Sequence, residues 1–299
     1  MSIKTLLPSL GGNQRIILCE GKFDFNFIDS ILSLRTNRID IYPAHAVKSL
    51  APVRAFLEQG IIIRDRDFKF TVEQAQDSFT TTEHETIWKR YDIEGYLLYA
   101  DWIQQAFETI QSTRPGRKLS VPSVEQIEAF IIAKSREQIL HYAGNRTVKD
   151  LHPSFSMLHE ATQLKVSDPT PTDVTACVDD FTRQIDNLRI QAGELDTLPE
   201  LQPENIAIRL QDYLQRYDEF AQNMDTIRIH FSGKKLLEAV WAEWLQPLRI
   251  KDFGKDDLSK ELIPIAKGYA THLALLRDDE RLGDFALLGE KSLADGTAL

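Results

Sequence analysis

Carboxylates directly follow two of the most apolar runs in the chain. The first run, Ile16–Cys19, leads straight into Glu20. The second run, Ile61–Arg64, is followed by Asp65 and Asp67. A buried strand end is an unfavourable place for carboxylates unless they bind something. Strands in a sheet are about 4.8 Å apart and Mg²⁺ takes oxygen ligands at about 2.1 Å, so acids on adjacent strand ends can share one ion. The pattern indicates a site for a divalent cation, Mg²⁺ or Mn²⁺.

The elements around these acids alternate between strand and helix. Apolar runs predict strands over 15–20, 39–42 and 61–64, and helical spacing of apolar residues predicts helices over 23–34 and 47–57. Such β-α-β-α-β alternation predicts an α/β fold, a Rossmann-like parallel sheet with right-handed crossovers. Ligands bind at the carboxyl ends of strands in sheets of this kind, where the acids would lie.

The rest of the chain has a mainly helical pattern. We expect one domain over residues 1–110 and a helical region over 111–299, with residues of about 226–245 returning to the metal site. Ser123 and Gln126 have the spacing of a capping box at a helix start. The expected segments are a hairpin or loop over 71–84, helix over 87–107 beginning near residue 92, helix over 123–142, connectors over 143–175, helices over 179–190 and 203–223, a strand over 226–231, helices over 234–245 and 258–276, and a partly ordered tail after 277.

Composition limits the classes of function. The chain has 299 residues and a net charge of −10, which argues against charge-driven adhesion to nucleic acid and confines any such contact to one face. No stretch approaches the roughly 20 apolar residues of a membrane span, and the start lacks a signal-peptide core, so no membrane association is expected. Two cysteines, Cys19 and Cys177, without a CxxC pair fit the cytoplasm.

Four short runs resemble motifs of the OLD-like Toprim nuclease family. LCEGKFD, with its E-G-x-x-D pattern, and IIIRDRDF, with D-x-D, are similar to the two Toprim metal motifs. RYDIEGYL (Arg90–Leu97) resembles the family's IENYL motif, with Gly95 in place of the usual Asn, and FSGKKLL (Phe231–Leu237) resembles its late GK-x-LL motif. The branch includes the nuclease subunit of the PARIS anti-phage defence system. The resemblance covers mainly residues 15–100 and 230–240.

The resemblance implies a role for each matching residue. Glu20 would be a metal ligand or general base, Asp65 and Asp67 metal ligands, and Lys234 a contact to phosphate oxygen or transition-state charge. The remaining matches are Asp24, which would support a metal ligand or cap the helix, and Glu94, as a further metal ligand. The residues alone leave other interpretations open, with Glu94 as an acid favoured at a helix start and Lys234 as a solvated lysine.

The resemblance also implies a Mg²⁺-dependent nuclease, a toxic effector of anti-phage defence. An ABC-type ATPase would hold and release it, the substrate would be RNA, tRNA included, or DNA, and a homodimer would form on release. Basic residues beside the acids and in a Pro-Gly loop are candidate nucleic-acid contacts: Arg64, Arg66, Arg114, Arg117 and Lys118. Arg64 and Arg66 pairing with the aspartates, and a merely solvated loop, are the competing interpretations.

Two other functions fit parts of the sequence. A Toprim-like binding or scaffold subunit without nuclease activity is favoured by the acidic balance and by Gly95, and opposed by the intact acids. A phosphotransferase acting on small nucleotides would need a glycine-rich phosphate loop. Ser232-Gly233-Lys234-Lys235 is not one, because Arg228 stands where the first glycine belongs.

Overall fold

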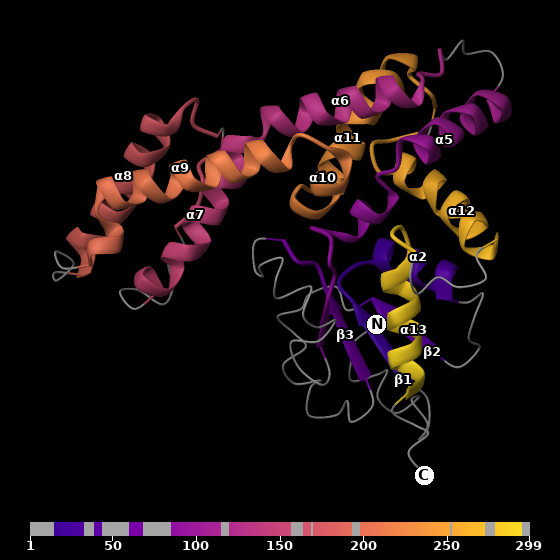
Figure 1. The fold of residues 1–299 in the computed structure, drawn as a ribbon, viewed down its shortest axis with the longest axis horizontal. Coiled ribbons are helices and arrows are strands. Elements are labelled where there is room, and N and C mark those ends of the chain that lie inside the picture. Colours follow the sequence, from indigo (N-terminus) through magenta and orange to yellow (C-terminus); the bar gives the residue numbers. More distant parts are fainter. Residues whose placement is uncertain are drawn as a thin grey trace. The chain divides into compact units, whose positions relative to one another are not determined.

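A computed structural model of the chain describes residues 15–32, 39–43, 60–67, 85–114, 120–156, 164–168, 170–192, 198–251, 253–272 and 279–294 (Figure 1). The strands are β1 (Arg15–Cys19), β2 (Ile39–Pro43), β3 (Gly60–Arg64) and β4 (Glu85–Ile87). The α-helices are α2 (Lys22–Leu32), α5 (Ala100–Thr113), α6 (Val124–Glu137), α7 (Ile139–Ser156), α8 (Val174–Ala192), α9 (Pro203–Phe220), α10 (Met224–His230), α11 (Gly233–Trp244), α12 (Asp257–His272) and α13 (Gly283–Ala294). The 3₁₀ helices are η3 (Ile93–Leu97), η4 (Pro199–Leu201) and η5 (Gln246–Leu248).

Four parallel strands form the sheet, in the order β2-β1-β3-β4. Ile17 of β1 lies opposite Ile41 of β2 and Ile61 of β3, and Ile63 of β3 lies opposite Thr86 of β4. The predicted α/β class and the three predicted strands are confirmed. Because the strands are parallel, their carboxyl ends meet at one edge, and the residues that follow β1, β3 and β4 come together there.

The chain divides into two compact units. The first contains Met1–Ile127 and Ser232–Leu299, and so extends beyond residue 110, the expected domain limit. The second unit contains Glu128–Phe231. Residues 226–231 belong to the second unit, whereas the described part of 232–245 belongs to the first.

The core of the first unit includes a helix near the end of the chain. α13 lies beside α2 and β1 (Figure 1). The fully buried Phe285 ring of α13 lies 5.1 Å from Phe27, 5.0 Å from Trp88 and 5.1 Å from Tyr96, measured between ring centroids. Residues after 277 were expected to be only partly ordered; of these, Gly283–Ala294 is an α-helix, and 278 and 295–299 lie outside the described residues. The helix is held to the unit by Phe285, whose ring has three aromatic neighbours.

Phe285→Ala is expected to destabilise the first unit strongly. Removing a fully buried phenylalanine leaves a cavity among three rings and lowers the free energy of unfolding by about 3–5 kcal/mol. Chemical denaturation measures the change. Ile208→Ala is the control, because the side chain of Ile208 is 68% exposed and its truncation should change stability by less than about 0.5 kcal/mol. Equal denaturation midpoints for the two variants would contradict this packing.

The second unit contains most of α6 together with α7, α8, η4, α9 and α10, and aromatic rings from α7 and α9 pack with Phe231 in its core. The ring of Tyr142 lies 4.8 Å from Phe231 and 5.8 Å from Tyr217. Asp150 of α7 ties that helix to α9, since it accepts a hydrogen bond from the Tyr213 hydroxyl and lies 3.5 Å from Arg209. The unit is therefore held by side-chain packing between helices.

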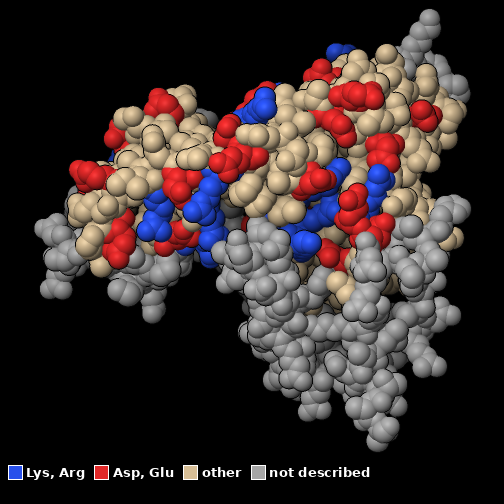
Figure 2. Space-filling view, viewed as in Figure 1, with Lys and Arg blue, Asp and Glu red and all other residues tan. Residues whose placement is uncertain are grey.

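The described surface carries both signs of charge. Figure 2 shows Lys and Arg side chains interspersed with Asp and Glu on the face that it presents. No helix in the described part of the chain is long and apolar enough to cross a bilayer.

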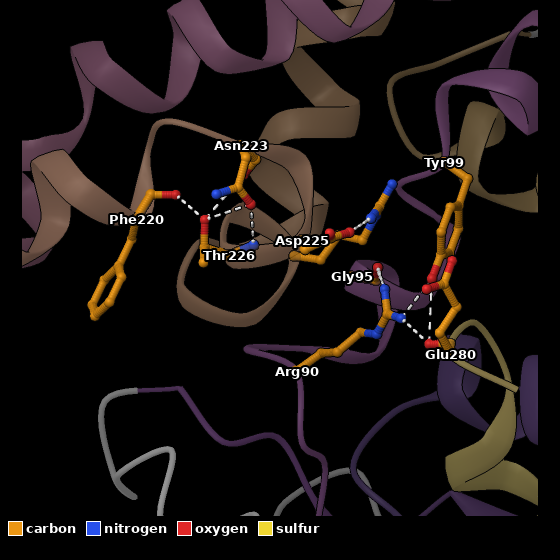
Figure 3. Close-up of polar contacts among 9 residues, drawn as sticks. Arg90, Gly95, Tyr99, Phe220, Asn223, Asp225, Thr226 and Glu280 are labelled. Carbon is orange, nitrogen blue, oxygen red and sulfur yellow. Dashed lines mark hydrogen bonds and ion pairs between the residues drawn. The ribbon is translucent and has the colours of Figure 1, made fainter. Parts of the chain in front are cut away.

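Several predicted elements are wrong in kind or extent. Residues 226–231 were expected as a strand, but Met224–His230 is helix α10, which begins where the Asn223 side chain accepts the Thr226 N–H at 3.0 Å (Figure 3). The apparent period of two misled the prediction, since burial at Ile227 and Phe231 follows a helical period.

The predicted helix over 87–107 begins later than expected. Ile87 ends strand β4, and the first α-helical residue is Ala100, after the 3₁₀ helix η3. The predicted helix over 123–142 is two helices that break at Gln138. Its capping box is confirmed: the N–H of Ser123 donates to Gln126 Oε1 at 2.8 Å, and the N–H of Gln126 donates to Ser123 Oγ at 3.3 Å.

Proline misled the prediction for the next segment. Connectors were expected over 143–175, but α7 continues through Pro153 to Ser156. A proline in the last turn of a long helix removes one hydrogen bond and does not by itself end the helix. The predicted helix over 47–57 and the loop over 71–84 lie outside the described residues.

Candidate functional site

Acidic residues gather at the carboxyl edge of the sheet, as the sequence predicted. Glu20 follows β1, and Asp65 and Asp67 follow β3. The N–H of Asp67 donates to the Tyr91 carbonyl at 2.9 Å, which ties the D-x-D segment to the chain that follows β4. Asp67 has a φ of 44°, a left-handed conformation that aspartate tolerates better than most residues. Together with their neighbours these residues form the acidic cluster, Glu20, Asp24, Asp65, Asp67, Asp92 and Glu94.

Asp24 serves the start of α2. Its Oδ2 accepts the Gly21 N–H at 2.7 Å, so the carboxylate caps an N–H group that the helix leaves unpaired. The side chain is 8% exposed, and burial raises the pKa of Asp24 to about 6. This geometry matches the capping role expected for Asp24.

Burial and mutual repulsion raise the pKa values of the cluster. Burial, followed by the charges of Asp24 and Asp92, raises the pKa of Asp65 well above its usual value. Burial and the charge of Asp92 raise the pKa of Glu94 to about 8, although Lys234 opposes the rise. These carboxylates therefore repel one another at the sheet edge, and a bound cation would reduce that repulsion.

Asp65 contributes a buried carboxylate oxygen to the cluster. Asp65 Oδ1 is inaccessible to solvent and has no hydrogen-bond partner among the described residues. A carboxylate oxygen of this kind suits a hard cation such as Mg²⁺ or Mn²⁺, which prefers oxygen ligands. The acids are close enough to raise one another's pKa values, but among the described residues no three His, Cys, Asp or Glu are arranged to hold an ion.

Asp92 is the residue of the cluster that sequence reasoning missed. It is 5% exposed, and four donors surround it. Oδ1 accepts the N–H groups of Gly95 at 3.0 Å and Gly233 at 2.9 Å. Oδ2 accepts the Ser232 hydroxyl at 2.6 Å and the Lys234 N–H at 3.4 Å. Burial raises the pKa of Asp92 to about 6 even though these hydrogen bonds favour the charged form. An aspartate three residues before a glycine is a capping signal, but its partners in α11 could not be read from it.

Arg90 fixes the 3₁₀ helix that carries Glu94. Its guanidinium donates to the Gly95 carbonyl at 2.9 Å, the Tyr99 hydroxyl at 2.6 Å and the Glu280 carbonyl at 2.8 Å (Figure 3). It also lies 4.6 Å from the centroid of the Tyr96 ring. The motif RYDIEGYL therefore forms a rigid support, in which the buried arginine holds the backbone around Glu94.

Lys234 is an exposed residue at the start of α11, the helix that contacts η3. Its charge acts on Glu94, which places the ammonium in the field of the acidic cluster. Gly233 allows this approach, because a Cβ there would lie 2.3 Å from the Gly95 nitrogen. The structure thus brings the late lysine motif to the acids from 140 residues away in sequence.

The candidate nucleic-acid contacts differ in their exposure to solvent and in their partners. Arg66 is 5% exposed, so the expectation of a surface contact there is wrong. Arg64 is partly exposed at the end of β3. Arg114 lies over the Phe253 ring at 4.7 Å and 4.0 Å from Glu261, so it has partners within its own unit. Arg117 and Lys118 lie outside the described residues.

Cys19 is a buried residue at the end of β1. It is 2% exposed, and burial raises the pKa of its thiol to about 12, which disfavours the nucleophilic thiolate.

No protein-family model matches the chain, and a search of curated proteins finds no match. The site must therefore be interpreted from its own geometry.

Proposed function

We propose that the chain is a Toprim nuclease that hydrolyses phosphodiester bonds with Mg²⁺ or Mn²⁺. The observation that supports this most is the convergence of acids from three parallel strand ends with a lysine from α11. Carboxylates that raise one another's pKa and a nearby ammonium suit a phosphate bridged by metal. A bound divalent cation would neutralise the phosphate and lower the pKa of an attacking water.

The protein groups have distinct tasks in this proposal. Glu20, Asp65, Asp67 and Glu94 would hold the metal, and Glu20 alternatively takes the proton of the attacking water as general base. Lys234, exposed at the start of α11, would donate to a phosphate oxygen as negative charge builds up there. Asp24 stays with α2 and acts by positioning Glu20 through the Gly21 turn.

The biological setting follows only from the motif resemblance. We propose a cytoplasmic, toxin-like effector of anti-phage defence that an ABC-type ATPase holds and releases. Its substrate would be RNA, tRNA included, or DNA, and release would allow a homodimer. The mixed surface charge in Figure 2 suits a nucleic-acid contact confined to a small area around the acids rather than a broad basic face.

Glu20→Gln tests the proposed activity. Purified wild-type protein, free of any partner, should cut tRNA, bulk RNA or plasmid DNA when Mg²⁺ or Mn²⁺ is present and stop when EDTA is added. Glu20→Gln keeps the size of the side chain but removes its charge, so cleavage should fall by a factor of about 10³ or more. Glu108→Gln, at an exposed position of α5, is the matched control and should cut like wild type. Absence of cleavage by the wild type with every substrate and both metals would refute the nuclease.

A second candidate is a Toprim-like binding or scaffold subunit. Two observations favour it: Gly95 replaces the motif's Asn, and a pKa of about 8 leaves Glu94 largely neutral at pH 7 when no metal is bound. Such a protein would bind Mn²⁺ through the acidic cluster and cut nothing. Metal titration together with the cleavage assay separates the two candidates.

A further inference from the structure

One buried carboxylate holds the starts of two helices that are far apart in sequence. Asp92 precedes η3 and accepts the N–H of Gly95, the third residue of that helix. The same carboxylate accepts the N–H of Gly233 and of Lys234, the first two residues of α11. The positive ends of both helices thus share one anion, which stabilises each of them.

We call the contact that Asp92 makes between the starts of η3 and α11 the joint. The Ser232 hydroxyl completes it. It donates to Asp92 Oδ2 at 2.6 Å, and its oxygen accepts the Lys235 N–H at 3.3 Å as the cap of α11. Ser232 is 7% exposed, so water cannot easily replace its contact. A hydrogen bond between a hydroxyl and a buried carboxylate is strong, and its loss leaves the carboxylate under-satisfied.

The two helices carry the two groups whose relative position matters most. Glu94 lies in η3, two residues after Asp92, and Lys234 lies in the first turn of α11. The backbones are in close contact at Gly233, where a Cβ would lie 2.5 Å from the Glu94 carbonyl carbon. The contact that Asp92 makes therefore sets the separation of the two backbone segments from which the lysine and the glutamate extend.

We propose that Asp92 is a positioning residue, which with Ser232 holds Lys234 at a fixed place relative to Glu94. This inference rests on the proposed nuclease for its catalytic meaning. The carboxylate of Asp92 accepts four hydrogen bonds from the protein, so its role is to join the two helices. When the joint is loosened, the lysine keeps its charge and the acids keep theirs, but the two no longer meet a phosphate together.

The test uses the full-length protein and changes the hydroxyl alone. Ser232→Ala removes the donor and leaves Asp92 in place, and Ser232→Thr restores a hydroxyl. Ser135→Ala is the matched control, because it removes another buried hydroxyl, bound to the Ile131 carbonyl at 2.9 Å and belonging to the second unit. Asp92→Asn is a second variant that keeps the volume of the side chain.

The first readout needs no activity. Carbodiimide cross-linking joins an amine to a neighbouring carboxylate, and mass spectrometry measures the link between residues 234 and 94. Its yield should fall about tenfold in Ser232→Ala and at least as far in Asp92→Asn, stay at the wild-type level in Ser135→Ala, and recover in Ser232→Thr. Unchanged yield in both Ser232→Ala and Asp92→Asn would overturn the proposal, whether or not the protein is a nuclease.

The second readout separates positioning from metal binding. In Ser232→Ala, kcat should fall about tenfold while KM and the Mn²⁺ affinity stay as in wild type. A loss of Mn²⁺ affinity that matches the loss of kcat would show that the joint serves the metal site and not the lysine, and would overturn the proposal. A wild-type protein that cuts nothing would refute the nuclease, and the cross-link would then decide on the joint alone.

Discussion

Asp65→Asn is expected to make the metal-free protein more stable at about pH 8 and to abolish its proposed activity. Burial and the charges of neighbouring acids raise the pKa of Asp65 well above its usual value, and its Oδ1 has no hydrogen-bond partner among the described residues. A raised pKa means that the folded state binds the proton more tightly than the unfolded state. The stability linked to this proton is present below the unfolded pKa and is lost as pH rises through the folded pKa.

The neutral amide of Asn removes that loss. We expect a gain of about 1–3 kcal/mol in the free energy of unfolding at about pH 8, and almost no change near pH 4, where the wild-type carboxyl is protonated. Chemical denaturation at the two pH values measures both numbers. Loss of stability in Asp65→Asn at the higher pH would show that the carboxylate is not repelled by its neighbours.

Metal should stabilise the wild type more than Asp65→Asn, which is the reverse of the order expected without metal. Bound carboxylates must be deprotonated, so Mg²⁺ or Mn²⁺ should raise the Tm of the wild type more at about pH 8 than at about pH 6. Asp65→Asn should show little of this shift and should lose cleavage by a factor of about 10³ or more. Glu108→Gln, exposed on α5, should keep both the metal response and the activity. The same shift in Asp65→Asn as in wild type would exclude Asp65 as a ligand.

The sequence predicted three of the four strands, though not β4, together with the acids that follow β1 and β3, because these depend on local patterns. β1, β2 and β3 are short, mostly apolar segments, and the polar residues that follow them mark where each strand ends. Once the strands are taken as parallel, the convergence of Glu20 with Asp65 follows from geometry alone. The prediction of a helix from Phe23 was also right to within one residue at its start.

What the sequence concealed depends on partners far along the chain. Asp92 binds Ser232 and Gly233, 140 and 141 residues away, and no local pattern pairs them. Arg90 is 7% exposed because Glu280, 190 residues away, accepts one of its hydrogen bonds. A charged residue is expected at the surface unless its partners are known, so the burial of Arg90 could not be predicted.

Gly233→Ala is expected to be among the most destabilising single substitutions in the first unit. An added Cβ would lie 2.3 Å from the nitrogen of Gly95, 2.5 Å from the carbonyl carbon of Glu94 and 2.7 Å from the Cα of Gly95. All three are backbone atoms, which cannot rotate away as a side chain would. The methyl group must therefore push η3 and α11 apart, and the separation breaks the hydrogen bonds that Asp92 accepts from Gly233 and Ser232.

The expected loss combines overpacking with an under-satisfied buried carboxylate, about 3–5 kcal/mol of the free energy of unfolding. Gly268→Ala is the matched control, since Gly268 lies in α12 of the same unit and a Cβ there meets nothing within 4 Å. That change should stabilise the helix by about 0.5–1 kcal/mol. Chemical denaturation of both variants gives the comparison. If Gly233→Ala unfolded at the wild-type midpoint, η3 and α11 could not be in contact at this glycine, and the placement of Lys234 beside Glu94 would fall with that contact.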